Sequence, residues 1–165
     1  MKKIKISISL SEYAEGEALP KGDELLINEA TTALETSYAP YSQFSVGAAV
    51  LLENGEVIRG SNQENTAYPS GLCAERVAIF TAKSKYPKMA IKAIAITAHT
   101  DNFEINTPIT PCGACRQVIA ETEKRQDKKI KILMKGHSGP TLSVDGIESL
   151  LPLVFHEEKL KKQIK

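Results

Sequence analysis

Residues 4–10 alternate between apolar and polar side chains. The apolar positions are Ile4, Ile6, Ile8 and Leu10. A period of two is typical of a β-strand with one buried face, so the pattern predicts a strand at this end of the chain. The segment that follows, Ser11 to Gly22, is rich in glycine and proline and predicts a turn-containing linker.

A helix is predicted from about Glu24 to Ser37. Its apolar residues, which recur at helical spacing, are Leu25, Leu26, Ala30, Ala33 and Leu34. We expect Asp23 or a neighbour to cap the first turn, because a side-chain oxygen at that position accepts a free backbone N–H. Ala39-Pro40 is expected to end the helical region, since the residue before proline disfavours helical backbone.

One strand is predicted on each side of Asn54-Gly55. The first runs from Phe44 to Glu53 and the second from Glu56 to Ser61. Asn-Gly is a preferred dipeptide of two-residue hairpin turns because both residues tolerate positive φ. The segment from Asn62 to Leu72 contains Pro69 and Gly71, and it predicts a loop.

The second half of the chain alternates strands with helices. Ala90 to Ala98 is almost continuously apolar, as in a strand buried on both faces. Further strands are predicted at Lys129 to Met134 and Thr141 to Val144, and a short helix from Val144 to Leu151. A hairpin followed by strand–helix–strand alternation predicts one α/β domain over residues 1–165. Its expected architecture is a three-layer α/β/α sandwich around a mixed sheet of about five strands.

Composition narrows the class of protein. The 165 residues include 21 basic and 20 acidic side chains, a net charge of +1, so we expect no electrostatic surface for nucleic acid. No apolar run reaches membrane-spanning length and no signal peptide is predicted. Three clustered cysteines favour reduced thiols and a cytoplasmic location. The charged run from Glu157 onward is expected to be a solvated tail.

All three cysteines lie in two short motifs, Cys73-Ala74-Glu75-Arg76 and Pro111-Cys112-Gly113-Ala114-Cys115-Arg116-Gln117. Each motif precedes apolar residues at helical spacing, so each is predicted to begin a helix. Free N–H groups and the positive end of the dipole at a helix start lower thiol pKa values. Three thiolates at two helix starts predict a tetrahedral zinc site with one position open for water.

The residues after Cys73 indicate chemistry beyond metal binding. Glu75 lies about 200° around the helix from Cys73, so it is poorly placed as a fourth ligand and well placed to touch a group bound beside the metal. Arg76 lies on nearly the same face as Cys73 and is predicted to donate hydrogen bonds to the thiolates, offsetting their charge.

Simpler interpretations remain open on these residues alone. Cys112 and Cys115 could form a redox dithiol, or the cysteines could hold a structural zinc ion. A structural site usually needs a fourth ligand, and His99, His137 and His156 are isolated in the sequence. Glu75 could simply be a dipole partner in a first helical turn, and Arg76 part of a surface ion pair.

The two cysteine motifs, in this order, resemble the zinc-dependent cytidine deaminases of the small, three-cysteine type. Three further stretches carry the resemblance: residues 40–49 are similar to the family's first strand, Asn62–Pro69 to its Asn-x-Glu-Asn substrate loop, and Leu150–Phe155 to its Leu-Leu-Pro-x-x-Phe tail. The resemblance covers about Asp23 to Phe155, so residues 1–22 lie outside it. Thr66 stands where the family often has a smaller alanine.

The resemblance implies one zinc ion per chain and hydrolytic deamination of cytidine and 2′-deoxycytidine to uridine and 2′-deoxyuridine, within pyrimidine salvage. A zinc-bound hydroxide would attack the ring, with Glu75 as the proton shuttle. By the same resemblance Phe44 packs on the base, Asn62 and Glu64 bind the ribose, and the backbone of Ala74 contacts the amine and carbonyl edge of the base.

The resemblance also implies a homotetramer, in which Tyr68 and Phe155 line the pocket of a neighbouring subunit. A free nucleoside is the expected substrate, because Glu64 needs a hydroxyl donor that an internal nucleotide of a polymer lacks. The alternatives are a blasticidin S deaminase and, less compatible with a cysteine as first ligand, a polynucleotide-editing deaminase. A non-enzymatic alternative is a zinc-stabilised interaction module.

Overall fold

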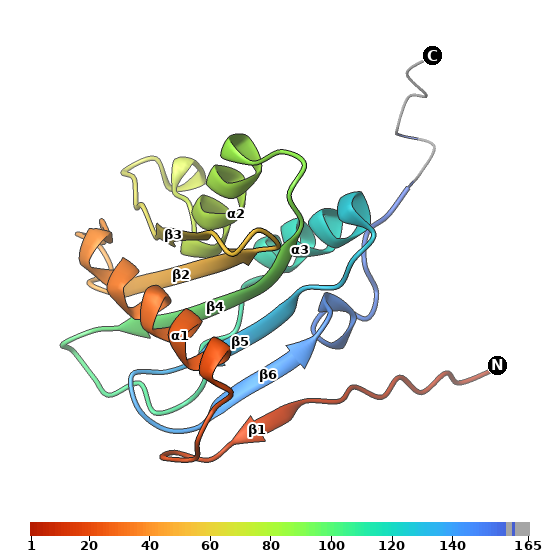
Figure 1. Ribbon diagram of the computed structural model, residues 1–165, viewed down its shortest axis with the longest axis horizontal. Helices are drawn as coiled ribbons and strands as arrows, with labels where there is room; N and C mark the ends of the chain where they lie inside the picture. The colour runs from red at the N-terminus through yellow and green to blue at the C-terminus, as the bar shows by residue number, and fades with distance from the viewer. Residues whose placement is uncertain (158–159, 161–165) are drawn as a thin grey trace.

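The computed structural model describes residues 1–157 and residue 160. Its centre is one six-stranded mixed sheet with the order β1-β6-β5-β4-β2-β3 (Figure 1). The strands are β1 (Ser11–Tyr13), β2 (Ser45–Leu52), β3 (Val57–Ser61), β4 (Ile91–His99), β5 (Lys131–Lys135) and β6 (Thr141–Asp145). β4 and β5 are parallel, and every other neighbouring pair is antiparallel.

Helices cover both faces of this sheet. The α-helices are α1 (Lys21–Ala33), α2 (Ala74–Lys85) and α3 (Gly113–Gln126), and the 3₁₀ turns are η1 (Leu34–Thr36), η2 (Tyr68–Ser70) and η3 (Ile147–Ser149). α1 packs on one face, and α2 and α3 pack on the other (Figure 1). The α/β/α sandwich is therefore confirmed, with six strands in the sheet rather than about five. None of the helices in the described residues has the length and apolarity needed to cross a bilayer.

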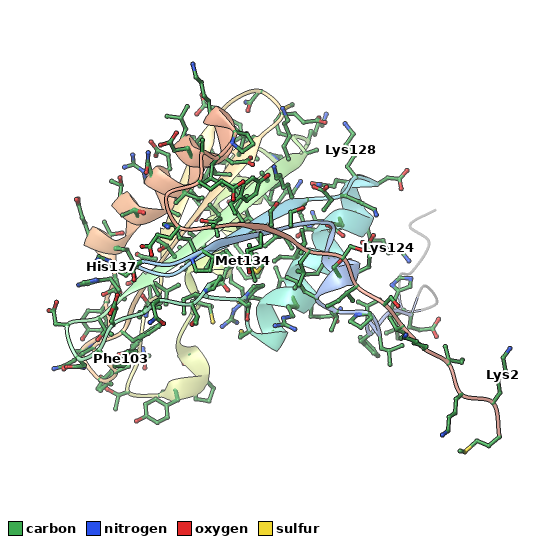
Figure 2. All side chains as sticks on the ribbon, turned by 90° about the horizontal axis from the view of Figure 1, so that it is seen from below. Lys2, Phe103, Lys124, Lys128, Met134 and His137 are labelled. Carbon is green, nitrogen blue, oxygen red and sulfur yellow. The ribbon has the colours of Figure 1, made fainter. Side chains whose placement is uncertain are left out.

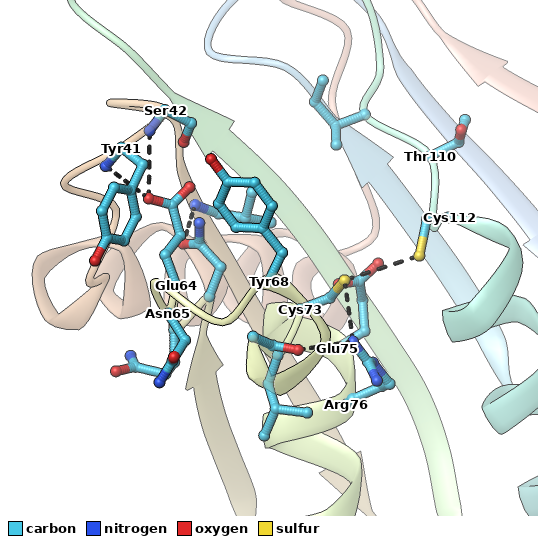
Figure 3. A pocket seen from close by; sticks show the side chains of 16 residues that line it. Tyr41, Ser42, Glu64, Asn65, Tyr68, Cys73, Glu75, Arg76, Thr110 and Cys112 are labelled. Atoms are coloured by element: carbon cyan, nitrogen blue, oxygen red, sulfur yellow. Dashed lines mark hydrogen bonds between the residues drawn. The ribbon is translucent and has the colours of Figure 1, made fainter.

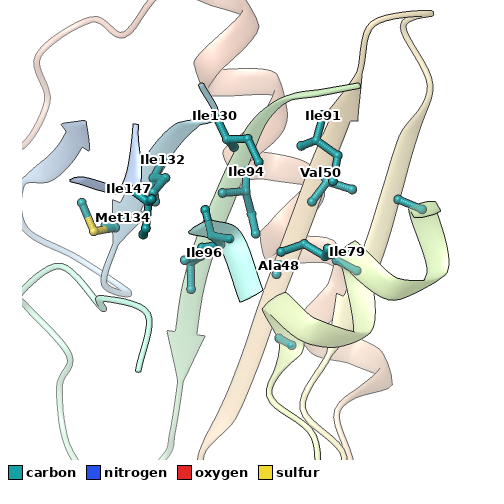
Figure 4. Close-up of a cluster of buried hydrophobic side chains, with 14 of the residues drawn as sticks. Ala48, Val50, Ile79, Ile91, Ile94, Ile96, Ile130, Ile132, Met134 and Ile147 are labelled. Atoms are coloured by element: carbon teal, nitrogen blue, oxygen red, sulfur yellow. The ribbon is translucent and has the colours of Figure 1, made fainter. Parts of the chain in front are cut away.

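The larger part of the core lies between the sheet and the α2–α3 layer (Figure 4). It is built mainly from isoleucines of β4, β5 and the helices, and branched side chains of this kind pack well on a pleated surface. Close backbone contact fixes α2 on the sheet. A Cβ atom on Gly60 of β3 would lie only 2.4 Å from the backbone nitrogen of Ala78. This contact holds the first turn of α2, and hence Cys73, close to the sheet.

The strand predicted at residues 4–10 is wrong. The structure places β1 at Ser11–Tyr13, inside the predicted linker, and the preceding residues are extended without a neighbouring strand (Figure 2). The reason is the register with β6, in which Ser11 lies opposite Ser143. In this register the last two residues of β6 would lie opposite Leu10 and Ser9, so β6 has no residue to pair with the chain before Ser9.

The first helix also differs from its prediction. It begins at Lys21, and its N-cap is Pro20, which makes no side-chain capping bond. Asp23 lies in the first turn and forms an ion pair with Lys131 instead of capping. Leu25, which the apolar pattern placed on the buried side, is 65% exposed. The buried side is formed by Leu26, Ile27, Ala30 and Ala33.

The remaining elements match their predictions within a few residues. Gly55, in the hairpin turn, has a φ of +88°. The short helix predicted from Val144 to Leu151 is the single 3₁₀ turn η3, because β6 continues to Asp145 before it. Of the predicted charged tail, residues 158–159 and 161–165 lie outside the described residues.

Candidate active site

The three cysteine thiols meet at the starts of α2 and α3. Cys73 is the N-cap of α2 and Cys112 is the N-cap of α3, as the sequence motifs predicted. The Sγ atoms of Cys73 and Cys112 are 3.8 Å apart and those of Cys112 and Cys115 are 3.5 Å apart. A tetrahedral zinc ion with Zn–S bonds of about 2.3 Å places its sulfur ligands about 3.8 Å apart. All three Sγ atoms lie within 4.8 Å of one another, so they fit one zinc ion.

The surroundings of the cluster favour an ionised thiol. Hydrogen bonding from the Cys115 thiol, together with Arg76 and Cys112, lowers the pKa of Cys73 to about 5 despite its partial burial. The same hydrogen bond to Cys73, followed by burial, raises the pKa of Cys115. The two shifts are opposite in direction, lowered for Cys73 and raised for Cys115. A cation bound between the three sulfur atoms would then favour the thiolate form of each.

Glu75 lies in the first turn of α2 with its side chain at the wall of a cavity beside the thiols (Figure 3). The residue is only 4% exposed. Burial, followed by the negative charge of Cys73, raises the pKa of its carboxyl group above the ordinary value. The shift makes this carboxyl group a better proton acceptor than an ordinary glutamate, which suits acid–base chemistry.

Arg76 contacts the cluster from the same turn of helix. Its Nη2 donates to Cys73 Sγ at 3.7 Å and to the carbonyl oxygen of Gly71 at 3.4 Å. The hydrogen bond to Cys73, with the charge of Cys73 as a smaller cause, raises the pKa of the guanidinium group, so the attraction between the two groups is mutual. Arg76 Nε is buried and has no hydrogen-bond partner within the described residues. A buried donor of this kind beside three sulfur atoms is consistent with a more anionic, metal-loaded cluster.

The cavity has a volume of about 630 Å³, a size typical of small-molecule sites. Its walls come from the turn before β2, the loop after β3, the start of α2 and the loop before α3. The lining residues are Tyr41, Ser42, Val46, Asn62, Gln63, Glu64, Asn65, Tyr68, Gly71, Leu72, Cys73, Glu75, Arg76, Ile109, Thr110 and Cys112. Cys73, Cys112 and Glu75 lie at one end and Glu64 lies at the other (Figure 3).

Glu64 is fixed as an anionic acceptor in this cavity. Its Oε2 accepts from the backbone N–H groups of Tyr41 at 2.9 Å and Ser42 at 3.3 Å. Hydrogen bonding to Ser42 is the main cause that lowers the pKa of Glu64. Tyr41 and Ser42 were not singled out from the sequence as site residues. The available signal was their position after Pro40, in a turn that the family resemblance assigned to a strand.

Asn62 lines the cavity and also holds its wall together. Its Oδ1 accepts from Ser37 Oγ at 2.6 Å and from the backbone N–H of Val46 at 2.8 Å. Its Nδ2 donates to the carbonyl oxygen of Phe44 at 2.9 Å. An amide group has two N–H donors, so one donor of Asn62 is left for a ligand. The residue therefore positions the start of β2 as well as facing the cavity.

Of the four other residues predicted to contact the substrate, only Tyr68 lines the cavity. Tyr68 lines the cavity and is 79% exposed, and Ala74 is fully buried in the first turn of α2. Phe44 is not among the lining residues; its ring stacks on Phe103 with centroids 6.2 Å apart. Phe155 is 73% exposed and lies near α3, where its carbonyl oxygen accepts from Gln117. Within one chain, the structure does not bring Phe44 or Phe155 to the cavity.

Three further residues noted in the sequence, Thr66, His99 and His137, do not line the cavity. The hydroxyl of Thr66 is 2.6 Å from that of Tyr41, and Thr66 does not line the cavity. His99 and His137, which are isolated in the sequence, lie together with their Nδ1 atoms 3.3 Å apart. In the described part of the chain, however, the cluster of potential metal ligands consists of the three cysteines alone.

Comparison with known proteins identifies this site. Residues 20–134, which include both cysteine motifs, match the cytidine and deoxycytidylate deaminase zinc-binding region. The chain belongs to the cytidine deaminase family. Within it, the chain is 50% identical over 98 residues to a cytidine deaminase of Halalkalibacterium halodurans, covering 59% of this chain and 70% of that one. It is 42% identical over 137 residues to one of Sporosarcina psychrophila, covering 83% and 93%.

A solved structure agrees with the sequence relatives. The cytidine deaminase of Burkholderia pseudomallei superposes on this chain with a TM-score of 0.69 and 36% identity, covering 80% of this chain and 98% of that one. Family membership shows cytidine deamination, the hydrolysis of a C–N bond, with zinc as the metal. The redox and structural-zinc interpretations of the cysteines are therefore set aside.

Proposed function

We propose that this deaminase hydrolyses free cytidine and 2′-deoxycytidine to uridine and 2′-deoxyuridine, releasing ammonia, as a step of pyrimidine salvage. The observation that carries the proposal is the buried carboxyl group of Glu75, which faces the cavity beside the three thiols. A zinc ion held by Cys73, Cys112 and Cys115 would lower the pKa of a bound water molecule and so supply the nucleophile at neutral pH.

Glu75 then transfers two protons, one after the other. Its carboxylate takes a proton from the attacking water and delivers it to N3 of the ring as oxygen bonds to C4. The Glu75 carboxylate next takes the second proton from the oxygen now bonded to C4 and transfers it to the exocyclic amine. The C4–N bond then breaks to release ammonia as the C4=O bond of uridine forms. The raised pKa of Glu75 supports this exchange, because a carboxyl group of ordinary pKa gives up its proton too readily to store it.

Substrate orientation depends on the other end of the cavity. Glu64, held by Tyr41 and Ser42, would accept a hydrogen bond from a ribose hydroxyl, and the remaining N–H of Asn62 would donate to the sugar. A phosphate at that position would bring negative charge towards Glu64, so we propose a free nucleoside as the substrate.

Neighbouring subunits are proposed to complete the pocket in a homotetramer. Tyr68 and Phe155 are large, exposed aromatic side chains, and exposed aromatics of this kind are enriched in protein interfaces. Three thiols that must remain reduced to bind zinc favour the cytoplasm as the place of action.

The test follows the ultraviolet absorbance of cytidine and deoxycytidine with the purified protein and with Glu75→Gln, while zinc per chain is measured in both. We expect turnover by the wild type, a loss of about 10³-fold or more in the variant, and one zinc ion in each. Zinc-loaded protein that deaminates neither nucleoside would refute the substrate assignment, and blasticidin S would be tested next. An active Glu75→Gln variant would refute the proton shuttle.

A further inference from the structure

The extended segment before β1 has no role in the proposed reaction. It leaves the sheet as a continuation of β1 and projects from the body of the molecule, with Lys2 near its end (Figures 1 and 2). In the described part of the chain, no hydrogen bond or ion pair joins residues 1–9 to any other segment. The segment also lies outside the region that matches the deaminase family, residues 20–134.

One side of this segment is an exposed apolar stripe. The exposed fractions are 81% for Ile4, 51% for Ile6, 50% for Ile8 and 45% for Leu10. In β1, Glu12 lies opposite Leu142, which packs against the core on the α2–α3 side. Because side chains alternate along a strand, the stripe faces the same side of the sheet as Glu12. The apolar face of the sheet thus continues past the end of β6, and among the described residues of one chain these four side chains stay 45–81% exposed.

Within residues 1–157 and 160, the outer edge of β1 has no neighbouring strand, because β1 is the last strand of the sheet. An exposed strand edge with an apolar face is a template for pairing with another strand. We propose that residues 2–12, the N-terminal arm, pair antiparallel with the N-terminal arm of a second copy of this chain, with the two-fold axis at Ser7. The pairing would join two six-stranded sheets into one continuous sheet.

The sequence of the arm selects this register. With Ser7 opposite Ser7 of the other copy, every apolar residue of the stripe meets an apolar residue. The resulting pairs are Ile4 with Leu10 and Ile6 with Ile8, each formed twice. Cross-strand pairs of branched apolar residues stabilise an antiparallel ribbon.

The charges of the arm agree with the same register. Lys5 meets Ser9, Lys3 meets Ser11, and Lys2 meets Glu12, an opposite charge. An axis at Lys5 would set two lysines directly opposite each other, which is destabilising. An axis at Ile6 would place Leu10 opposite Lys2, and any axis between two residues would turn the stripe against the polar side of the other arm.

A matched pair of cysteine variants, Ser7→Cys and Ser9→Cys, tests the register in the zinc-loaded enzyme, with oxidised glutathione as the oxidant. Directly opposed residues have Cα atoms about 4.5–5.5 Å apart, within disulfide range. Residues 9 of the two arms would be separated along the strands by about 14 Å. We expect a disulfide-linked dimer on non-reducing gels from Ser7→Cys, little from Ser9→Cys, and a dimer again from the double variant Lys5→Cys/Ser9→Cys. No dimer from Ser7→Cys, or equal dimer from both single variants, would overturn the proposal.

A charge swap tests the pair at the ends of the arms. In the Ser7→Cys background, Glu12→Lys places like charges opposite each other at both ends, and we expect cross-linking about tenfold slower. Adding Lys2→Glu restores the opposite charges and should restore the rate. Failure of the double change to recover the rate would contradict the register. Cytidine turnover is measured in parallel, because no arm residue lines the cavity. A Ser7→Cys variant that turns over cytidine normally but forms no cross-link would refute the arm pairing and leave the proposed function intact.

Discussion

The helices α2 and α3 each follow an N-cap cysteine and carry an arginine in the first turn, but the two arginines bind different groups. α2 begins at Cys73 and has its arginine three residues later, whereas α3 begins at Cys112 and has its arginine four residues later. Both guanidinium groups bend back to the carbonyl oxygen five residues before them, Arg76 to Gly71 and Arg116 to Pro111. From there the two side chains reach different partners.

Arg76 continues to a thiol, while Arg116 continues to the chain after η3. Arg116 Nη1 donates to the carbonyl oxygen of Leu150 at 2.8 Å, and its Nε donates to Pro111 at 2.7 Å. The one-residue offset turns the arginine by about 100° around the helix axis, so the two side chains lie on opposite sides of their N-cap cysteines. An arginine beside a cysteine motif therefore donates to a thiol in α2 and to two main-chain carbonyl groups in α3.

Among the variants that test the difference between α2 and α3, loss of a zinc-binding thiol should change zinc content and turnover the most. We choose Cys115→Ser for this test. Cys115 is fully buried in the first turn of α3, and its loss leaves two sulfur ligands for a three-ligand site. We expect zinc content near zero and turnover of cytidine below detection, measured by metal analysis and ultraviolet absorbance. Full zinc occupancy in this variant would show that α3 does not supply a required ligand.

Exchanging the arginine of α2 should have the next largest effect. Arg76→Lys keeps the charge but loses the planar group that reaches both Cys73 and Gly71. We expect zinc affinity or kcat/KM to fall about 10- to 100-fold, with a small change in stability. Zinc affinity is measured by competition with a chelator. An unchanged affinity and an unchanged rate would mean that Arg76 does not act on the cluster.

Arg116→Lys is the matched change in α3, and its effect should fall on stability instead. Two carbonyl acceptors lose charged donors, so the free energy of unfolding should decrease by about 2–3 kcal/mol, measured by urea denaturation. The folded, zinc-loaded variant should keep its kcat within about threefold. A drop in kcat as large as that of Arg76→Lys would remove the distinction between the two arginines.

The sequence predicts the cysteine cluster well because both ligand motifs are local: each helix start fixes its cysteine within one turn. Prediction fails where the outcome depends on the length of a distant partner. The alternation at Ile4 to Leu10 predicts a strand, but β6 is too short to pair with it. Leu25 has the right spacing for burial, yet it lies at the edge of the stripe that α1 presents to the sheet. The role of Asn62 as a clamp between Ser37 and Val46 likewise depends on loop closure, which no spacing encodes.

The smallest expected effect concerns Glu123, a carboxylate in the last turns of α3 that has no counterpart in α2. Its oxygens accept from the backbone N–H groups of Ile130 and Ile147, but burial is the main influence and raises its pKa, with Glu148 adding to the rise and Lys129 opposing it. A raised pKa in the folded state means that the protonated form favours folding. The stabilisation is complete below the unfolded pKa, near 4.3, and is lost as pH rises through the folded value.

Glu123→Gln should therefore flatten this part of the pH profile, since an amide oxygen still accepts both hydrogen bonds and does not ionise. We expect the difference in free energy of unfolding, variant minus wild type, to rise by less than about 1 kcal/mol as the pH is raised from 4 to 7. The change is small because water screens a half-exposed carboxylate. Denaturation at each pH measures it, with Glu121→Gln on the same helix as the control. A relative stability that moves the other way would mean that the two backbone hydrogen bonds outweigh burial, and that this end of α3 prefers the charged carboxylate.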